Sequence, residues 1–240
     1  MANSVADNYL KVSNQIVQTA RKAGRSAEDV KLVVVTKGQS VQKIAEVIQA
    51  GATDLGENYP EETTQKISEM GQLASAVSWH MIGHLQSRKI KFVVDHFSMM
   101  HSIDRPSIAV ELNAKLDCFL DVLLEVNLSG EESKGGFQVS NPQNWAMFCE
   151  TVLDLQKLER LRIIGLMTMP PYTEDPEASR SVFRLCRELR DFVQKEANIR
   201  SIAQLSMGTS LDYNVAVEEG ATYVRVGEAI MGARDYSKKV

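Results

Sequence analysis

The sequence lacks long hydrophobic runs and has few cysteines. No apolar stretch approaches the roughly 20 residues that a membrane-spanning helix needs, and the first residues contain no apolar core of a secretory signal. Its three cysteines, Cys118, Cys149 and Cys186, are widely spaced, which does not suit a disulfide framework or a zinc site. We therefore expect a soluble, cytoplasmic protein with reduced thiols.

Positive charge is not in excess either, because 27 Lys and Arg residues and 31 Asp and Glu residues give a net charge of -4. Nucleic acids and anionic membranes attract cationic surfaces, so we expect neither as a partner. The four histidines show no HExxH or other ligand spacing, and we expect no metal site. P-loop and GxSxG motifs are also absent from the sequence.

Length and composition suit one domain with a sizeable core. The 240 residues are 44% hydrophobic and 24% charged, and no Pro-, Gly- or Ser-rich linker divides them. We expect residues 1–240 to form a single domain. Apolar residues between positions 3 and 23 recur every three or four residues, which predicts an amphipathic helix that ends at Gly24. We expect this segment, residues 1–24, to pack on the rest of the domain.

From residue 32 onward, short apolar runs alternate with helical patterns. The run 32–35 is Leu-Val-Val-Val, which is typical of a parallel strand buried on both faces. Seven further strands are expected at 54–55, 78–82, 99–103, 121–126, 162–167, 203–205 and 222–226. Helices are expected between them at 41–50, 60–70, 86–94, 106–116, 142–155, 175–196 and 212–218, with a short one at 228–232.

Eight alternating units match the size and pattern of a (β/α)8 barrel. The sequence therefore predicts an α/β fold, a single TIM-type barrel with an extra N-terminal helix. A doubly wound open sheet is the alternative, because it alternates in the same way and the segments 54–55 and 203–205 are weakly patterned as strands. In a barrel, the loops after the carboxyl ends of the strands carry the chemistry.

Lys37 lies directly after the most apolar of these strands. An amine in a poorly solvated setting has its charged form disfavoured, and the neutral amine is a nucleophile that forms an imine with an aldehyde. The alternative is a lysine whose aliphatic stem packs on the barrel rim while its ammonium group reaches water.

Two loops near the C-terminus together predict a phosphate site. The segment SMGTS, residues 206–210, follows the seventh strand, and Gly227 and Glu228 follow the eighth at the start of a short helix. Phosphate sites of barrels commonly use these two loops and the free N–H groups of a short helix. Two ordinary capped turns would give the same pattern.

Arg225 and Asn58 are further candidates for ligand contacts. Arg225 lies within the last strand, and a guanidinium that points into a barrel needs a carboxylate or a ligand heteroatom as its partner. Asn58 follows the second strand, where it is able to donate to a ligand oxygen or to cap a turn.

Seven segments occur in a characteristic order along the chain: LVVVTKGQS, DLGENYPEE, WHMIGHLQSRK, VNLSGEESKGGF, GLMTM, LSMGTSLDY and VRVGEAIMGAR. On these segments the chain resembles the pyridoxal phosphate (PLP) homeostasis proteins, single-barrel relatives of the N-terminal domain of alanine racemase. The resemblance implies that PLP is held by a covalent imine to Lys37. It further implies a phosphate held by Ser206 and the backbone of Gly227 and Glu228, Arg225 facing the pyridine nitrogen, Asn58 lining the ligand, and Met167 near its ring.

Some positions depart from the pattern of this family. Gly38, Gln39 and Ser40 replace a second Lys and a Pro that are usual after the PLP lysine, and Arg88 stands where Asn is common. Glu228 stands where Thr is common, so one hydroxyl is missing and a carboxylate repels the phosphate unless it turns to solvent. We expect weaker phosphate affinity than in relatives with Thr.

Function follows from the partner of the pyridine nitrogen. An arginine there favours the unprotonated ring, which stabilises a carbanion poorly. Alanine racemases carry a second domain after the barrel; this sequence ends at residue 240, shortly after Arg225, and we expect no such domain. We therefore expect a monomeric PLP-binding protein that maintains intracellular vitamin B6 and amino-acid homeostasis without substantial catalytic turnover, exchanging PLP with PLP-dependent apo-enzymes. The alternatives are a PLP-dependent racemase or lyase and a barrel enzyme that acts on a phosphorylated metabolite.

Overall fold

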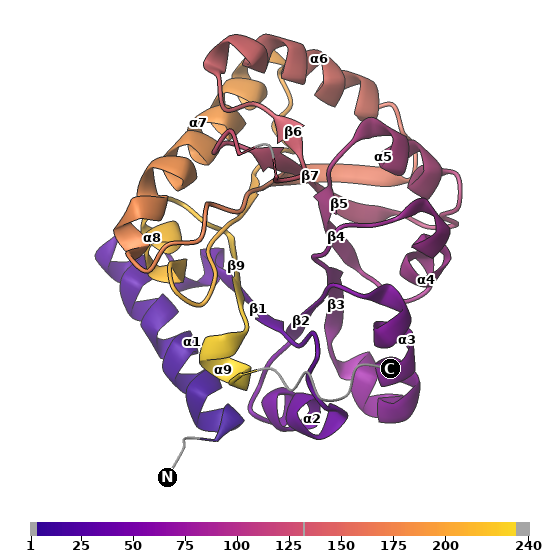
Figure 1. The fold of residues 1–240 in the computed structure, drawn as a ribbon, viewed down its shortest axis with the longest axis vertical. Helices are drawn as coiled ribbons and strands as arrows, with labels where there is room; N and C mark the ends of the chain where they lie inside the picture. The colour runs from indigo at the N-terminus through magenta and orange to yellow at the C-terminus, as the bar shows by residue number, and fades with distance from the viewer. Residues whose placement is uncertain (1–3, 132, 234–240) are drawn as a thin grey trace.

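A closed barrel of eight parallel strands forms the centre of the protein. The computed structural model describes residues 4–131 and 133–233. The barrel strands are β1 (Lys31–Val35), β2 (Asp54–Glu57), β3 (Ser78–Met81), β4 (Met99–Ile103), β5 (Leu120–Asn127), β7 (Leu161–Met167), β8 (Gln204–Ser206) and β9 (Tyr223–Val226). They pair in this order, and β9 pairs with β1 to close the ring (Figure 1). The predicted TIM-type barrel is confirmed, and the open sheet is excluded.

Helices surround the strands as an outer layer (Figure 1). They are α1 (Val5–Lys22), α2 (Val41–Gln49), α3 (Pro60–Met70), α4 (Lys91–Val94), α5 (Pro106–Asn113), α6 (Trp145–Leu155), α7 (Arg180–Glu196), α8 (Tyr213–Glu218) and α9 (Glu228–Met231). Short 3-10 helices precede α4, α6 and α7, at Ser87–Lys89, Pro142–Asn144 and Pro176–Ser179, and two more lie at Ala27–Asp29 and Gly71–Ala76. A strand that the sequence did not predict, β6 (Phe137–Gln138), pairs with the end of β5.

The N-terminal helix α1 packs on the outside of the barrel against α2, α8 and α9. Ser4 begins it with a capping box, because its hydroxyl accepts from the Asp7 backbone N–H and the Asp7 carboxylate accepts from the Ser4 N–H. Two hydrogen bonds tie the helix to the C-terminal part of the chain, from Asn8 Nδ2 to the Ile230 carbonyl at 3.2 Å and from Thr19 Oγ1 to Asn214 Oδ1 at 3.0 Å.

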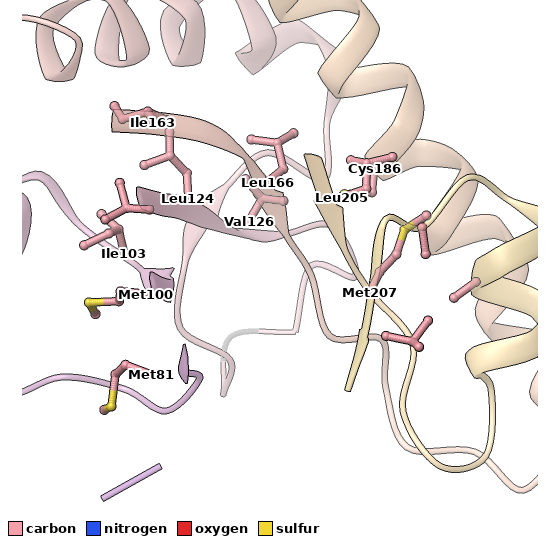
Figure 2. Close-up of a cluster of buried hydrophobic side chains, with 14 of the residues drawn as sticks. Met81, Met100, Ile103, Leu124, Val126, Ile163, Leu166, Cys186, Leu205 and Met207 are labelled. Carbon is pink, nitrogen blue, oxygen red and sulfur yellow. The ribbon is translucent and has the colours of Figure 1, made fainter. Parts of the chain in front are cut away.

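The main hydrophobic core lies between the outer face of the barrel and the helices. Figure 2 shows part of it, with side chains from neighbouring strands such as Leu124 of β5, Leu166 of β7 and Leu205 of β8, and with Cys186 of α7. Burial of one such aliphatic side chain contributes about 1.5–3 kcal/mol. No helix in the described part of the chain has both the length and the apolar character needed to cross a membrane.

The barrel interior is only partly apolar. Side chains alternate along a strand, so the residues that do not face the helices face the barrel axis. A small interior cluster consists of Val33, Met99, Leu123, Met167 and Tyr223. Buried polar side chains accompany it, namely His80, His101, Ser206 and Arg225. TIM barrels usually fill these layers with branched apolar residues, so this polar interior requires a chemical explanation.

Candidate functional site

Lys37 lies in the turn that follows β1, at the carboxyl end of the barrel. Its side chain is half-buried. The turn requires glycine at position 38, where φ is +68°. Two side chains of α3 hold the turn by hydrogen bonds. The Thr36 carbonyl accepts from Lys66 Nζ at 3.0 Å, and the Gly38 N–H donates to Glu62 Oε1 at 3.3 Å. The backbone that carries Lys37 is therefore held by α3.

A buried ion pair between Lys66 and Glu57 stabilises the contact of α3 with the turn after β1. Lys66 Nζ lies 2.7 Å from Glu57 Oε1, and Thr36 Oγ1 donates to the same carboxylate oxygen at 2.7 Å. Glu57 is fully buried at the end of β2. Burial raises the pKa of Glu57, and the Lys66 ammonium opposes that shift. The pair joins β2 and α3 to the turn after β1.

Arg225 of β9 points into the barrel and is 4% exposed. Its Nη1 donates to Ser206 Oγ at 2.5 Å and its Nη2 donates to the Thr168 carbonyl at 3.0 Å. Burial lowers the pKa of Arg225 to about 10, so the side chain remains a cation at neutral pH. Ser206 is the last residue of β8 rather than part of the following loop, and its hydroxyl also contacts His101 Nδ1 at 2.8 Å.

A second serine, Ser210, lies beside the start of α9. Its Oγ accepts hydrogen bonds from the N–H groups of Gly227 at 3.2 Å and Ala229 at 3.3 Å. The Gly227 backbone packs against the end of β1, where an added Cβ would lie 3.2 Å from the Cβ of Val35. Glu228 is exposed. Ser210 was not among the predicted contacts, although the SMGTS segment that contains it was singled out.

Asn58 and Met167 lie at the same end of the barrel. Asn58 directly follows β2, and its buried Oδ1 atom accepts no hydrogen bond from the described residues. Gly83 packs against it so closely that an added Cβ would lie 2.7 Å from the Asn58 Cα. Met167 is the last residue of β7 and is buried with Val33 in the barrel interior. An unused acceptor at Asn58 is the arrangement expected of a residue that contacts a ligand.

Acidic residues that the sequence analysis missed lie across the mouth. Glu125 of β5 lines a cavity of about 150 Å³ together with Lys134 and Met169. Burial raises the pKa of Glu125, and the nearby Asp104 carboxylate raises it further. Asp104 Oδ2 lies 2.5 Å from His84 Nδ1. The alternation of side chains along β5 predicts that Glu125 faces inward. Its proximity to Asp104, which follows β4, depends on the pairing of β4 with β5.

All seven predicted site residues, Lys37, Asn58, Met167, Ser206, Arg225, Gly227 and Glu228, lie at or next to the carboxyl ends of β1, β2, β7, β8 and β9. Strands β1, β2, β7, β8 and β9 are consecutive neighbours in the ring. The structure therefore brings an amine, a buried cation and a set of hydroxyl and N–H donors to one part of the barrel mouth. Such donors suit a ligand with both an electrophilic carbon and an anionic group.

Comparisons with known proteins agree in sequence and in structure. The sequence profile of the family described as "Alanine racemase, N-terminal domain" matches residues 12–235. The pyridoxal phosphate homeostasis protein of Aquifex aeolicus is 39% identical over 236 residues, which cover 97% of this chain and 100% of that protein. The protein of the same name from Escherichia coli K12 is 38% identical, with 99% of this chain and 100% of that protein covered.

Among solved structures, PipY of Synechococcus elongatus with PLP bound is similar to this chain with a TM-score of 0.77 and 29% identity. The similarity covers 90% of this chain and 100% of that chain.

Proposed function

This chain belongs to the family of pyridoxal phosphate homeostasis proteins, which share the fold of the alanine racemase N-terminal domain, and from that premise we propose that it binds PLP. In this proposal an imine to Lys37 holds PLP, the protein has no substantial catalytic turnover, and it serves vitamin B6 and amino-acid homeostasis in the cytoplasm. The observation that supports it most directly is the arrangement of Lys37, Arg225 and the Ser210 loop around one part of the barrel mouth.

Lys37 supplies the covalent link. Its ε-amine adds to an aldehyde carbon, a C=N bond forms, and the aldehyde oxygen leaves as water. An amine of another protein or of a free amino acid would add to the imine carbon, form a new C=N bond and release the Lys37 amine, so that PLP would leave with the incoming amine. This exchange suits a protein that stores PLP for apo-enzymes, because neither direction needs an oxidant or a second cofactor.

The phosphate contacts come from the two loops that the sequence indicated. We assign them to the Ser210 hydroxyl and to the N–H groups of the segment from Gly227 to Ala229, which already converge on Ser210 Oγ. Backbone N–H groups that converge at such a turn favour an anion, which would share them with Ser210 Oγ or replace it as their acceptor. The Ser206 hydroxyl is engaged by Arg225 and His101, so we assign Ser206 to the support of Arg225 instead.

Arg225 limits the reactions that bound PLP would support. Bound PLP supplies a pyridine ring that withdraws electrons strongly when its nitrogen is protonated. A guanidinium donates a hydrogen bond to that nitrogen but keeps its own proton, because Arg225 remains a cation at neutral pH. Asn58 Oδ1 offers one further polar contact at the edge of the ligand. These side chains bind and orient PLP and do not favour carbanion formation.

Absorption spectra and mass spectrometry test the proposal. We expect the purified protein to take up PLP and to show an imine absorption band in the violet that Lys37→Ala removes. Borohydride should reduce the imine and leave the PLP mass on the peptide that contains Lys37. Lys157→Ala is the matched control, because Lys157 is an exposed helix-end lysine paired with Asp154 on the surface.

A band of undiminished strength in Lys37→Ala would refute the lysine assignment. The same preparation, incubated with amino acids in deuterated water, should exchange no Cα hydrogen. Steady exchange would show a racemase- or lyase-like activity, and a colourless protein that binds only phosphorylated metabolites would refute PLP binding.

A further inference from the structure

A chain of hydrogen bonds runs through the barrel interior below Arg225. It passes from Arg225 Nη1 to Ser206 Oγ at 2.5 Å, from Ser206 Oγ to His101 Nδ1 at 2.8 Å, from His101 Nε2 to His80 Nδ1 at 2.9 Å, and from His80 Nε2 to Asp54 Oδ1 at 3.0 Å. Five side chains from β9, β8, β4, β3 and β2 therefore form one continuous path across the barrel.

The path is shielded from water except at its far end. Ser206 and His101 are fully buried, and His80 is 3% exposed. The Tyr223 ring packs against both imidazoles, with ring centroids 5.3 Å from His101 and 6.1 Å from His80. Asp54 lies at the amino-terminal end of β2, and its side chain is 15% exposed. Buried polar groups cost stability unless they are hydrogen-bonded, and here each one has its partner.

When the His80 and His101 rings are both neutral, the Arg225 guanidinium and the Asp54 carboxylate at the two ends determine which atom donates in each hydrogen bond. A guanidinium only donates, so Ser206 Oγ accepts from Arg225. An ionised carboxylate only accepts, so His80 carries its proton on Nε2 and accepts at Nδ1 from His101 Nε2–H. His101 Nδ1 is then an acceptor, and the only proton that can fill its contact is the Ser206 O–H. All four hydrogen bonds point from the arginine toward the aspartate.

We propose that Asp54, His80, His101 and Ser206 are positioning residues of the ligand site, whose one-way hydrogen-bond chain holds Arg225 in place as the donor to the ring nitrogen. This inference rests on the proposed function, because it takes Arg225 to be the partner of the PLP ring. The chain joins the buried cation to an anion at the opposite end of the barrel.

A proton added to either ring would reverse at least one of these hydrogen bonds. Protonated His80 donates from Nδ1 to His101, His101 then donates from Nδ1 to Ser206 Oγ, and the serine O–H must turn away. Protonated His101 still donates to His80 but also donates to Ser206 Oγ, and its charge then lies one side chain away from Arg225. Burial, followed by the charges of His80 and Arg225, lowers the pKa of His101 well below its ordinary value, which disfavours a proton on the ring next to Ser206.

The ionisable groups around the chain come from several elements. They are Lys31 of β1, Asp121 and Glu125 of β5, Cys186 of α7, Asp212 before α8 and Tyr223 of β9. Lys31 favours the charged form of Asp54, and Glu125 and Asp212 favour the charged form of Arg225. In the described part of the chain, no three His, Cys, Asp or Glu side chains surround a position for a metal ion.

Nuclear magnetic resonance of the histidine rings tests the chain without PLP. Long-range proton–nitrogen spectra of the protein at pH 8 should show His80 and His101 as rings protonated on Nε2, and the His101 signals should not change between pH 8 and pH 6. His80→Gln and His101→Gln assign the signals. Either ring protonated on Nδ1 alone at pH 8, or a doubly protonated His101 at pH 7, would overturn the proposed arrangement.

A spectroscopic titration tests the link to the ligand. In Ser206→Ala the guanidinium loses one anchor, so we expect the pH midpoint of the bound-PLP absorption band to rise by at least one unit, a tenfold change in proton affinity. Ser102→Ala is the matched control, because Ser102 is a buried serine of β4 that donates to the Gly83 carbonyl and does not touch the chain. Thermal unfolding checks that both variants fold.

Equal midpoints in wild type and Ser206→Ala would refute the positioning role while PLP binding stands. Absence of any bound-PLP band in wild type would refute the proposed function and with it the role toward the ring, and the ring spectra would still decide whether the chain exists.

Discussion

Glu228 is the residue of the site whose charge suits a phosphate least. It is the first residue of α9, and its side chain is exposed, so the carboxylate is able to turn to solvent. A carboxylate in the first turn also stabilises a helix, but it does so in the free and the ligand-bound protein alike. The effect of Glu228 on ligand binding is modest because water and salt screen an exposed charge.

We expect Glu228→Thr to lower the dissociation constant of PLP by about three- to tenfold, because it removes a like charge and adds a hydroxyl donor. Fluorescence or absorption titrations at low and high salt would measure it, with a smaller gain at high salt because ions screen exposed charges. Glu159→Thr makes the same charge change in the turn before β7, at the other end of the barrel, and should leave binding unchanged. Weaker binding by Glu228→Thr would contradict this view of the residue.

The position of a single site residue could be predicted from the sequence where the residues directly before it indicate a strand. Lys37 follows an unbroken apolar strand, and Gly227 follows the last strand, so each could be placed at the barrel mouth. The resemblance assigned the phosphate to Ser206 and gave no role to Ser210, because the roles of these two serines depend on where β8 ends. The strand runs to Ser206, which turns that hydroxyl inward to Arg225 and leaves Ser210 to face α9. The chain of hydrogen bonds from Arg225 to Asp54 joins five strands and has no local sequence signature.

At the scale of the element, the Glu57–Lys66 pair connects β2, α3 and the turn that carries Lys37. Removing one partner of a buried pair is expensive, because the other charge stays buried without compensation. We expect Lys66→Met to lower the free energy of unfolding by about 3–5 kcal/mol at pH 8. Lys89→Met, which removes a partly exposed pair with Glu61, should lower the free energy of unfolding by less than about 1 kcal/mol.

The decrease in the free energy of unfolding caused by Lys66→Met should depend on pH. Burial raises the pKa of Glu57 in the folded protein, so the folded state binds a proton more readily than the unfolded state does. The stability that a carboxyl with a raised folded pKa contributes is fully present below the pKa of the unfolded state, and it is lost as pH rises through the pKa of the folded state. Urea unfolding at pH 5, 6.5 and 8 should therefore show the variant approaching wild type as pH falls. A loss that is the same at all three pH values would contradict the buried-carboxylate explanation.

Element positions followed from periodicity for most of the chain. The predicted helices at 86–94, 142–155 and 175–196 each begin as a 3-10 turn, a distinction that hydrophobic spacing does not encode. The short strands β2 and β8 were predicted from the alternation of strands and helices, at 54–55 and 203–205, and each extends further toward its carboxyl end than predicted. Strand β6 was missed because two residues within the loop after β5 carry no periodic signal, and their pairing depends on how that loop folds back.

On the scale of the whole molecule, the site lies across the seam where the barrel closes. The first and last strands of the ring, β1 and β9, pair there, with Val34 opposite Val226. Lys37 follows β1 on one side of the seam, and Gly227 follows β9 on the other. Helix α1 spans the outside of the same region, since it contacts α2 and α9. A ligand bound to both loops would connect Lys37 and Gly227, which are 190 positions apart in the sequence.

Ligand binding should therefore stabilise the closed barrel as a unit. At about one hundred times its dissociation constant, PLP should raise the free energy of unfolding by about 2.7 kcal/mol. Pyridoxal, which has the aldehyde but no phosphate, should stabilise much less at the same concentration, because it engages the loop after β1 and not the loops after β8 and β9. Urea unfolding measures the gain, and hydrogen exchange should place the added protection on the amides of β1 and β9. Equal stabilisation by pyridoxal and PLP would mean that the Ser210 loop does not hold the phosphate, and that the two sides of the seam are not joined through the ligand.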